Sequence, residues 1–254
     1  MTQLERAEMF RGLHEGEPFV IPNPWDAGSA KVLAGLGFRA LATTSSGFAY
    51  TLGRKDGNTT LDELVAHVRV LAAATELPVS VDLEHGSADA IARVAEAGAV
   101  GGSIEDFDGE DILPLDAAVE HLSRAIEAAR ALPFPFTLTA RAENHIRGKL
   151  DLDDTIARLQ AYEVAGADVL YAPGLRTTEE IRAVCDAVSK PVNVLAFPGM
   201  TFAAIAAAGA QRVSVGGSLT WVAADAVIRA ATTIRDTGDF SVLAVDRSPR
   251  EFLD

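Results

Sequence analysis

Short apolar runs rich in β-branched residues recur along the chain and alternate with segments whose apolar residues repeat at helical spacing. A strand buried on both faces has this short apolar pattern, and parallel strands need a helical crossover between them. The alternation therefore predicts a parallel sheet covered by helices. The runs predicted as strands span residues 19–24, 40–45, 78–84, 99–105, 135–141, 168–173, 191–197 and 212–217.

The residues that introduce the strands support this organisation. Glycine ends the preceding helix before every second strand, at Gly37, Gly98, Gly166 and Gly209, whereas proline introduces the third, fifth and seventh strands. Eight such units in 254 residues fit a (β/α)₈ TIM barrel better than an open doubly wound sheet. The predicted helices include residues 61–74, 88–97, 117–131, 153–165 and 178–188.

Domain organisation follows from the same pattern. No linker rich in proline, glycine or serine divides the chain, so we expect a single α/β barrel domain over residues 1–254. Within it, residues 223–254 are expected to form a C-terminal helix and tail.

Composition narrows the range of partners. The chain is 48% hydrophobic, enough for a sizeable core, and carries a formal net charge of -14 that would repel nucleic acid and anionic membranes. Neither a secretion signal nor a run long enough to span a membrane is present in the sequence given. The single Cys185 fits a reducing compartment. We therefore expect a cytoplasmic protein with a small-molecule partner and no nucleic-acid or membrane partner.

Carboxylates follow two neighbouring predicted strands. Asp82 and Glu84 end the run 78–84, and Glu105 ends the run 99–105. Residues two apart on a strand face the same way, and the carboxyl ends of parallel strands meet at one edge. Three carboxylates around one point suit Mg²⁺ or Mn²⁺. The sequence predicts a metal site there, and salt bridges to Arg or Lys at the strand ends are the alternative.

Other strand ends carry groups suited to an organic acid. Arg141 offers a fork of donors for a carboxylate, although a salt bridge to Glu105 or Glu143 is an equally good interpretation. Ser46 and Gly47 offer a hydroxyl and unhindered N–H groups for a second carboxylate or an oxyanion, unless they form a simple turn. The charged, glycine-containing loop 47–60 is either a lid or a solvated surface loop.

Together these segments resemble the isocitrate lyase/phosphoenolpyruvate mutase superfamily from about residue 20 to residue 222. The segments that carry the resemblance are residues 22–30, Thr44-Ser45-Ser46-Gly47-Phe48, Leu52-Gly53-Arg54-Lys55-Asp56-Gly57-Asn58, Asp82-Leu83-Glu84-His85-Gly86, Ile104-Glu105-Asp106 and Ala140-Arg141-Ala142-Glu143. Glu84 stands where the family usually has Asp.

The resemblance implies roles for individual residues. Asp56 would be the catalytic aspartate of the mutases, and Arg141 would bind the substrate carboxylate. The substrate-binding turn would comprise Thr44, Ser46, Gly47 and Phe48, to which we add Asn193 at a strand end. Asp82, Glu84 and Glu105 would hold Mg²⁺ (or Mn²⁺), largely through water. His85 and His145 are interpreted as groups that flank the metal and Arg141.

The chain departs from the family's pattern at two places. The lyases carry a Lys-Lys-Cys-Gly-His gating loop, whereas residues 107–116 here are short, acidic and without cysteine. Cleavage of isocitrate or methylisocitrate with a cysteine acid is therefore not expected. Strand six ends in Tyr171-Ala172-Pro173, where relatives often have Glu or His. A different substrate or a weaker activity would follow.

The chemistry common to the family is cleavage beside a 2-oxo acid that leaves an enolate. We expect a Mg²⁺-dependent carbon–carbon lyase or decarboxylase that acts on a small 2-oxo or 2-hydroxy (di)carboxylic acid. The alternatives are phosphorus–carbon chemistry on phosphonopyruvate, as mutase or hydrolase, and a barrel that binds an oxo acid without turning it over. Because the family's barrels pair by swapping their last helices, we also expect a homodimer or homotetramer.

Overall fold

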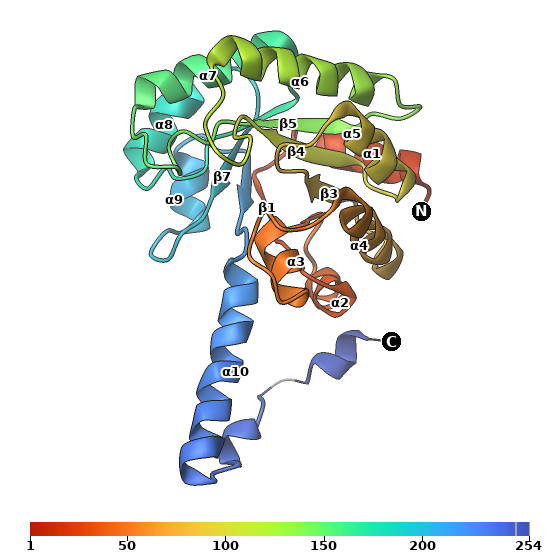
Figure 1. Cartoon of the computed structure of the whole chain (residues 1–254), viewed down its shortest axis with the longest axis vertical. Helices are drawn as coiled ribbons and strands as arrows, with labels where there is room; N and C mark the ends of the chain where they lie inside the picture. The colour runs from red at the N-terminus through yellow and green to blue at the C-terminus, as the bar shows by residue number, and fades with distance from the viewer. Residues whose placement is uncertain (247, 254) are drawn as a thin grey trace.

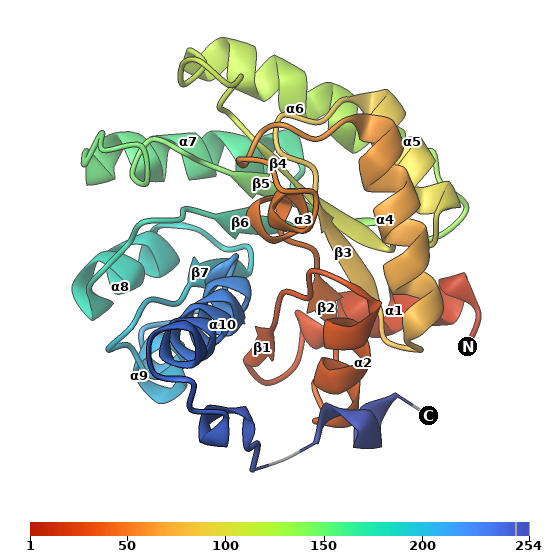
Figure 2. The ribbon, with the colours of Figure 1, turned by 60° about the horizontal axis from the view of Figure 1, so that its bottom comes forward.

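The computed structural model describes residues 1–246 and 248–253 of the chain. Eight parallel strands form one sheet in the order β1-β8-β7-β6-β5-β4-β3-β2, with helices around it (Figures 1 and 2). The strands are β1 (Phe19–Ile21), β2 (Leu41–Ala42), β3 (Val79–Asp82), β4 (Gly101–Glu105), β5 (Thr137–Arg141), β6 (Val169–Tyr171), β7 (Val192–Leu195) and β8 (Arg212–Ser214).

The two ends of this sheet meet, so the barrel is nearly closed. The Ala42 N–H donates to the Pro22 carbonyl across 3.1 Å, and the Asn23 side-chain amide donates to the Thr43 carbonyl across 3.0 Å. Each predicted strand is present, although shorter than its apolar run. The (β/α)₈ TIM barrel predicted from the sequence is confirmed.

The helices begin and end where local signals place them. The four glycines predicted to end helices, Gly37, Gly98, Gly166 and Gly209, all have the left-handed φ that terminates a helix without strain. The helices are α1 (Gln3–Leu13), α2 (Ala27–Gly35), α3 (Ser45–Thr51), α4 (Leu61–Ala74), α5 (Ala88–Glu96), α6 (Leu115–Arg130), α7 (Leu152–Ala165), α8 (Thr178–Ala187), α9 (Phe202–Ala207) and α10 (Ser218–Thr237), with 3₁₀ turns η1 (Ser241–Leu243) and η2 (Pro249–Phe252).

One helix occupies a segment expected to be a turn. The Thr44 hydroxyl accepts the Gly47 N–H across 3.3 Å and so caps the N-terminus of α3. The segment between this helix and α4 is therefore shorter than the loop 47–60 expected from the sequence.

The two ends of the barrel differ in access. Phe10 of α1 is fully buried and packs with Phe19 and Val100, close to where their strands begin. This helix therefore covers the amino end of the barrel. The carboxyl ends of the strands are not covered by this helix, and active sites in this fold usually lie at that end.

Helix α10 projects away from the barrel, and the tail after it turns back towards α2 (Figure 1). Lys31 of α2 donates to the Leu253 carbonyl across 2.9 Å. Large apolar side chains are exposed on the projecting part, namely Trp221, Val222, Val227, Ile228, Phe240, Leu243 and Val245. Among the helices of the described residues, none has the length and apolar character needed to cross a membrane.

Candidate active site

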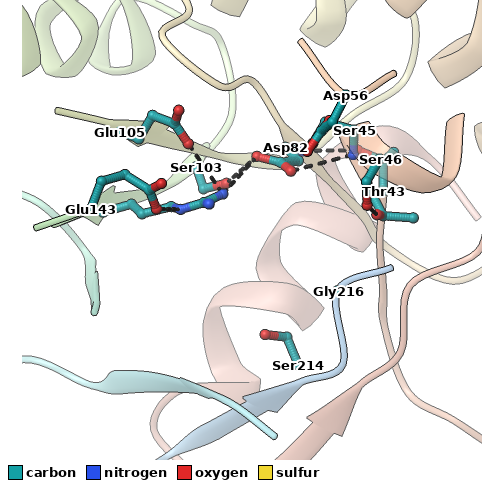
Figure 3. A network of polar contacts seen from close by, with 12 residues as sticks. Thr43, Ser45, Ser46, Asp56, Asp82, Ser103, Glu105, Glu143, Ser214 and Gly216 are labelled. Carbon is teal, nitrogen blue, oxygen red and sulfur yellow. Dashed lines mark hydrogen bonds and ion pairs between the residues drawn. The ribbon is translucent and has the colours of Figure 1, made fainter. Parts of the chain in front are cut away.

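Arg141 is the centre of a charged network at the carboxyl ends of β3, β4 and β5. Figure 3 labels the three carboxylates of this network, Asp82, Glu105 and Glu143. Arg141 Nη1 lies 3.4 Å from Asp82 Oδ1 and 3.3 Å from Glu105 Oε2, and its Nε donates to Glu143 Oε1. The register explains this cluster, because Glu105 pairs with Arg141 and Asp82 pairs with Ser103 on the adjacent strand. The salt bridges considered as the alternative role for Arg141 are thus present.

A second arginine, Arg147, completes the network, and the sequence analysis missed it. Its Nε donates to Glu143 Oε2 across 2.9 Å, and its Nη2 lies 3.9 Å from Glu105 Oε1. The guanidinium carbon stands 3.7 Å from the centre of the Phe107 ring. The spacing of four residues from Glu143 was the available signal, because it brings two side chains together on one helical turn.

Negative charge exceeds positive charge in this region. Burial, reinforced by Asp82 and Asp56, raises the pKa of Glu84 to about 7. Burial also raises the pKa of Glu105 to about 8, with Glu143 and Asp82 acting in the same direction against Arg141. A raised carboxyl pKa means that the ionised form lacks sufficient compensation. A further cation would therefore stabilise both carboxylates.

The three predicted metal ligands do not converge on a single point. Strand β3 ends at Asp82, and Glu84 follows in a left-handed conformation with φ of 51°, so the alternation of a strand does not apply to it. Within residues 1–246 and 248–253, no three His, Cys, Asp or Glu side chains are close enough to hold a metal directly. The long Asp82 and Glu105 contacts and the uncompensated charge fit a cation reached through water.

Two cavities open at this end of the barrel. The inner chamber, of about 190 Å³, is lined by Asp82, Arg141 and a series of hydroxyl and amide side chains, which include Thr43, Thr44, Ser45, Ser46, Ser103, Tyr171, Asn193 and Ser214. The outer cavity, of about 670 Å³, is lined by Glu84, Glu105 and Arg147 among others. Asp56 lines both cavities and therefore stands where they meet.

A family model described as phosphoenolpyruvate phosphomutase matches residues 10–235 of the chain. The chain belongs to this family. Membership confirms the resemblance to the phosphoenolpyruvate mutase/isocitrate lyase superfamily that the strand-end motifs carried.

The relatives of this phosphomutase-family chain include two whose names state different activities. It is 30% identical to the 2-methylisocitrate lyase of Halalkalibacterium halodurans, over 99% of this chain and 89% of the relative. It is 31% identical to the oxaloacetate decarboxylase of Bradyrhizobium diazoefficiens, over 76% of this chain and 71% of the relative. A crystal structure from Burkholderia cenocepacia J2315, described as a lyase or mutase, has 50% identity and a TM-score of 0.95, and covers 98% of this chain and 95% of its own.

The inner chamber of this family member contains most of the predicted substrate-binding residues. Thr44, Ser46, Arg141 and Asn193 line it. The Thr44 and Ser46 hydroxyls lie 3.2 Å apart, so they present adjacent polar groups to a ligand. The structure thus brings together residues from β5, β7 and the start of α3.

Gly47 and Phe48 do not line the inner chamber. The Phe48 ring is buried and stacks on His67 with 4.0 Å between ring centres. A β-carbon at position 47 would lie 2.6 Å from Thr220 Oγ1, so only glycine lets α3 approach α10 this closely. We therefore assign both residues to the positioning of α3.

The loop that carries Asp56 is attached at one side. Arg54 Nη1 donates to both Glu63 oxygens of α4 across 2.9 Å, while Asp56 itself is exposed. The two flanking histidines lie farther out. His85 stacks on His121 beside the outer cavity, and His145 Nε2 is 3.8 Å from Glu180 Oε1. Neither histidine lines the inner chamber.

Proposed function

We propose that the protein is a Mg²⁺-dependent lyase or decarboxylase that cleaves a carbon–carbon bond in a small 2-oxo or 2-hydroxy (di)carboxylic acid and leaves an enolate. The observation that supports this most strongly is the inner chamber. It is small, it contains the Arg141 guanidinium, and it borders carboxylates short of positive charge. A chamber of this size admits a compact acid and excludes a larger cofactor-like ligand. Oxaloacetate is the first substrate to test, because one relative is an oxaloacetate decarboxylase.

Arg141 would bind the substrate carboxylate. Its Nε is already committed to Glu143, and its Nη1 makes only long contacts to Asp82 and Glu105. A carboxylate in the chamber could take shorter, charge-assisted hydrogen bonds from the same guanidinium. Asp82, Glu105 and Glu143 together hold the pKa of Arg141 above its usual value, against the effect of burial, so the guanidinium stays charged.

Asp82, Glu84 and Glu105 would hold Mg²⁺ or Mn²⁺ through water. Bound there, the ion supplies a Lewis acid for the negative charge that develops on the substrate oxygen. The chain supports this arrangement, because the Thr43 hydroxyl accepts the Asp82 N–H across 2.8 Å and so fixes the backbone at the end of β3.

Thr44 and Ser46 would donate hydroxyl hydrogen bonds to the substrate, and Asn193 would close the opposite wall of the chamber. Asp56, at the junction of the two cavities, would act as an acid–base group or nucleophile when its loop covers the substrate. All four of these residues line the inner chamber.

A second candidate function is phosphorus–carbon chemistry on phosphonopyruvate. Asp56 favours it, since a carboxylate that reaches the inner chamber can accept a phosphoryl group. A barrel that binds oxo acids without turnover is the third possibility, and the absence of the lyase gating motif favours it.

A substrate panel separates these functions. Purified enzyme with millimolar Mg²⁺ should release CO₂ and pyruvate from oxaloacetate or pyruvate from another small 2-oxo or 2-hydroxy diacid. Phosphate release from phosphonopyruvate, or its isomerisation, would support the second function. Tight oxalate binding with no turnover of any panel member would support a barrel that binds oxo acids without turning them over.

We further propose that the chain acts in the cytoplasm as a homodimer or homotetramer in which α10 and the tail pair with another copy. The exposed apolar side chains of α10 and its tail support this, because a face of this kind is normally covered by a partner. Light scattering at micromolar concentration should give a mass at least twice 26.7 kDa, and a monomer would contradict the assembly.

A further inference from the structure

Tyr171 has a buried side chain in the inner chamber that the roles above leave unused. It is the last residue of β6, is 8% exposed, and lies opposite Arg141 on one side and Asn193 on the other. The Arg141 guanidinium carbon is 5.4 Å from the centre of its ring. Ser214 on β8 lies close enough to its hydroxyl to act on the pKa of the phenol, which it lowers against the effect of burial. The phenol therefore stands beside the group that would bind the substrate.

A directed chain of hydrogen bonds ends at Ser214, beside this hydroxyl. Arg212 Nε donates to Asn193 Oδ1 across 2.9 Å, and Asn193 Nδ2 donates to Ser214 Oγ across 3.0 Å. Ser214 already accepts from Asn193, so its own proton is available for the Tyr171 oxygen. Donation along this chain runs from Arg212 towards Tyr171. The proton of Tyr171 is then free to point at a ligand in the chamber.

Among the described residues, the cation at the start of this chain has only neutral hydrogen-bond partners. Besides Asn193, Arg212 donates to Thr139 Oγ1 across 2.9 Å and to His14 Nε2 across 3.2 Å. Nδ1 of His14 is 2.9 Å from the Phe10 carbonyl, and burial lowers the pKa of His14 to about 3, so this ring is a neutral acceptor. Within the described residues, no carboxylate forms an ion pair with Arg212. A buried charge of this kind stabilises any negative charge that forms nearby.

We propose that Tyr171 is the acid that protonates the enolate carbon, with Arg212, Asn193 and Ser214 as positioning residues. This inference rests on the proposed function. A C–H bond forms at the enolate carbon and the phenol O–H bond breaks. The electron pair of the carbon–carbon double bond enters the new C–H bond, and the C2 carbonyl re-forms. A hydrogen bond donated by Ser214 would stabilise the phenolate, which recovers its proton from water.

The other hydroxyl groups in the chamber and the two nearby histidines are less suited to this step. Aliphatic hydroxyls such as Ser45 and Ser103 are far weaker acids than a phenol. Burial raises the pKa of Tyr171 to about 12, while Arg141 and Ser214 oppose the rise, so the phenol is protonated at neutral pH. His85 and His145 lie outside the chamber lining.

The decisive variant is Tyr171→Phe, which removes one oxygen and keeps the ring. Wild-type enzyme with Mg²⁺ in D₂O should exchange the methyl protons of pyruvate for deuterium, and proton NMR measures the rate of this exchange. The variant should lose exchange by about 10²-fold or more, the usual contribution of a general acid. Release of CO₂ from oxaloacetate should fall by less than about tenfold, because cleavage precedes protonation and free enolpyruvate ketonises in water.

The controls separate an acid from a structural role. Tyr50→Phe, on the exposed end of α3, should leave both rates unchanged. Oxalate affinity, measured by calorimetry, should be the same in Tyr171→Phe and wild type. Ser214→Ala should slow exchange more than CO₂ release without altering the ring, and it serves as the test if Tyr171→Phe does not fold.

Three outcomes would overturn the inference. Exchange at the wild-type rate in both variants would assign the proton to Asp56 or water. An equal fall of exchange and CO₂ release, or loss of oxalate binding, would give Tyr171 a structural role only. A wild-type enzyme that neither exchanges pyruvate protons nor cleaves any panel acid would overturn the proposed function itself, and this inference with it.

Discussion

The two sides of the inner chamber handle charge in different ways. On the side of β3, β4 and β5, carboxylates and arginines contact one another directly, and negative charge is left over. On the side of β6, β7 and β8, the groups that line the chamber are a phenol, an amide, a hydroxyl and Arg212, whose guanidinium hydrogen-bonds to the amide and to no carboxylate among the described residues. In Figure 3 Ser214 stands well apart from Glu105 and Glu143. The first side is suited to bind anions through cations, and the second to supply a proton.

Removal of the metal should have the largest effect on turnover of all these tests. It acts on the side of the chamber formed by β3, β4 and β5. Because Asp82, Glu84 and Glu105 share too little positive charge, EDTA should abolish turnover, and Mg²⁺ or Mn²⁺ should restore it. A steady-state assay before and after chelation measures this. Full activity after exhaustive dialysis against EDTA would contradict the metal site. It would show that the arginines alone balance the charge of these carboxylates.

Asp56→Ala tests the entrance between the two cavities. If Asp56 transfers a proton in the cleavage step, turnover should fall by about 10²-fold or more, while Mg²⁺ affinity is unchanged. Lys55→Ala, on the same loop but outside both cavity linings, is the matched control. Wild-type turnover in the Asp56 variant would mean that this carboxylate is only a solvated loop charge.

Arg141→Lys tests recognition of the substrate carboxylate. Lysine keeps the charge but loses the forked donor geometry, so oxalate should bind about 1–3 kcal/mol more weakly. Arg147→Lys is the comparison, since Arg147 lines the outer cavity and its side chain is 42% exposed. Calorimetry should show the larger loss for Arg141. Equal oxalate affinity in wild type and Arg141→Lys would mean that Arg141 forms salt bridges with its neighbours and does not bind the substrate carboxylate.

The smallest effect among these predictions is expected in the pH dependence of folding stability. The folded protein raises the pKa of Glu84 from its ordinary 4.5 to about 7, so ionising Glu84 disfavours the folded state. Without metal, wild type should lose stability relative to Glu84→Gln as the pH rises from about 4.5 through about 7. Urea unfolding at pH 5 and pH 8 measures the difference.

The control for this pH effect is Glu63→Gln. Arg54 and the Thr60 cap lower the pKa of Glu63 to about 2, so its carboxylate is ionised at both pH values in the folded state. Its stability difference from wild type should therefore be nearly constant between pH 5 and pH 8. A Glu84 difference equally independent of pH would contradict the raised pKa.

The sequence was most informative where the signal is local. Apolar runs, helix-ending glycines such as Gly166 and the acids at the end of β4 are all read from neighbouring residues, and the structure bears out the barrel they predict. The placement of Arg141 among carboxylates also followed, since register brings adjacent strand ends together.

The features that the sequence analysis missed depend on geometry at a distance. Glu84 leaves the strand because its backbone is left-handed, and Phe48 turns away because α3 is a helix. The chain from Arg212 to Tyr171 joins three strands, and no spacing in the sequence marks it. An arginine at an inward position of β8 was the available signal, since charge in a barrel interior needs an explanation.

The most direct test of the proposed chemistry is a crystal structure with oxalate and millimolar Mg²⁺. Oxalate should occupy the inner chamber with a carboxylate against Arg141, and electron density for a cation should lie between oxalate and the carboxylates of Asp82, Glu84 and Glu105, bridged by water. An empty chamber, or oxalate bound away from Arg141 with no density for a cation beside these carboxylates, would contradict a metal-dependent 2-oxo acid enzyme.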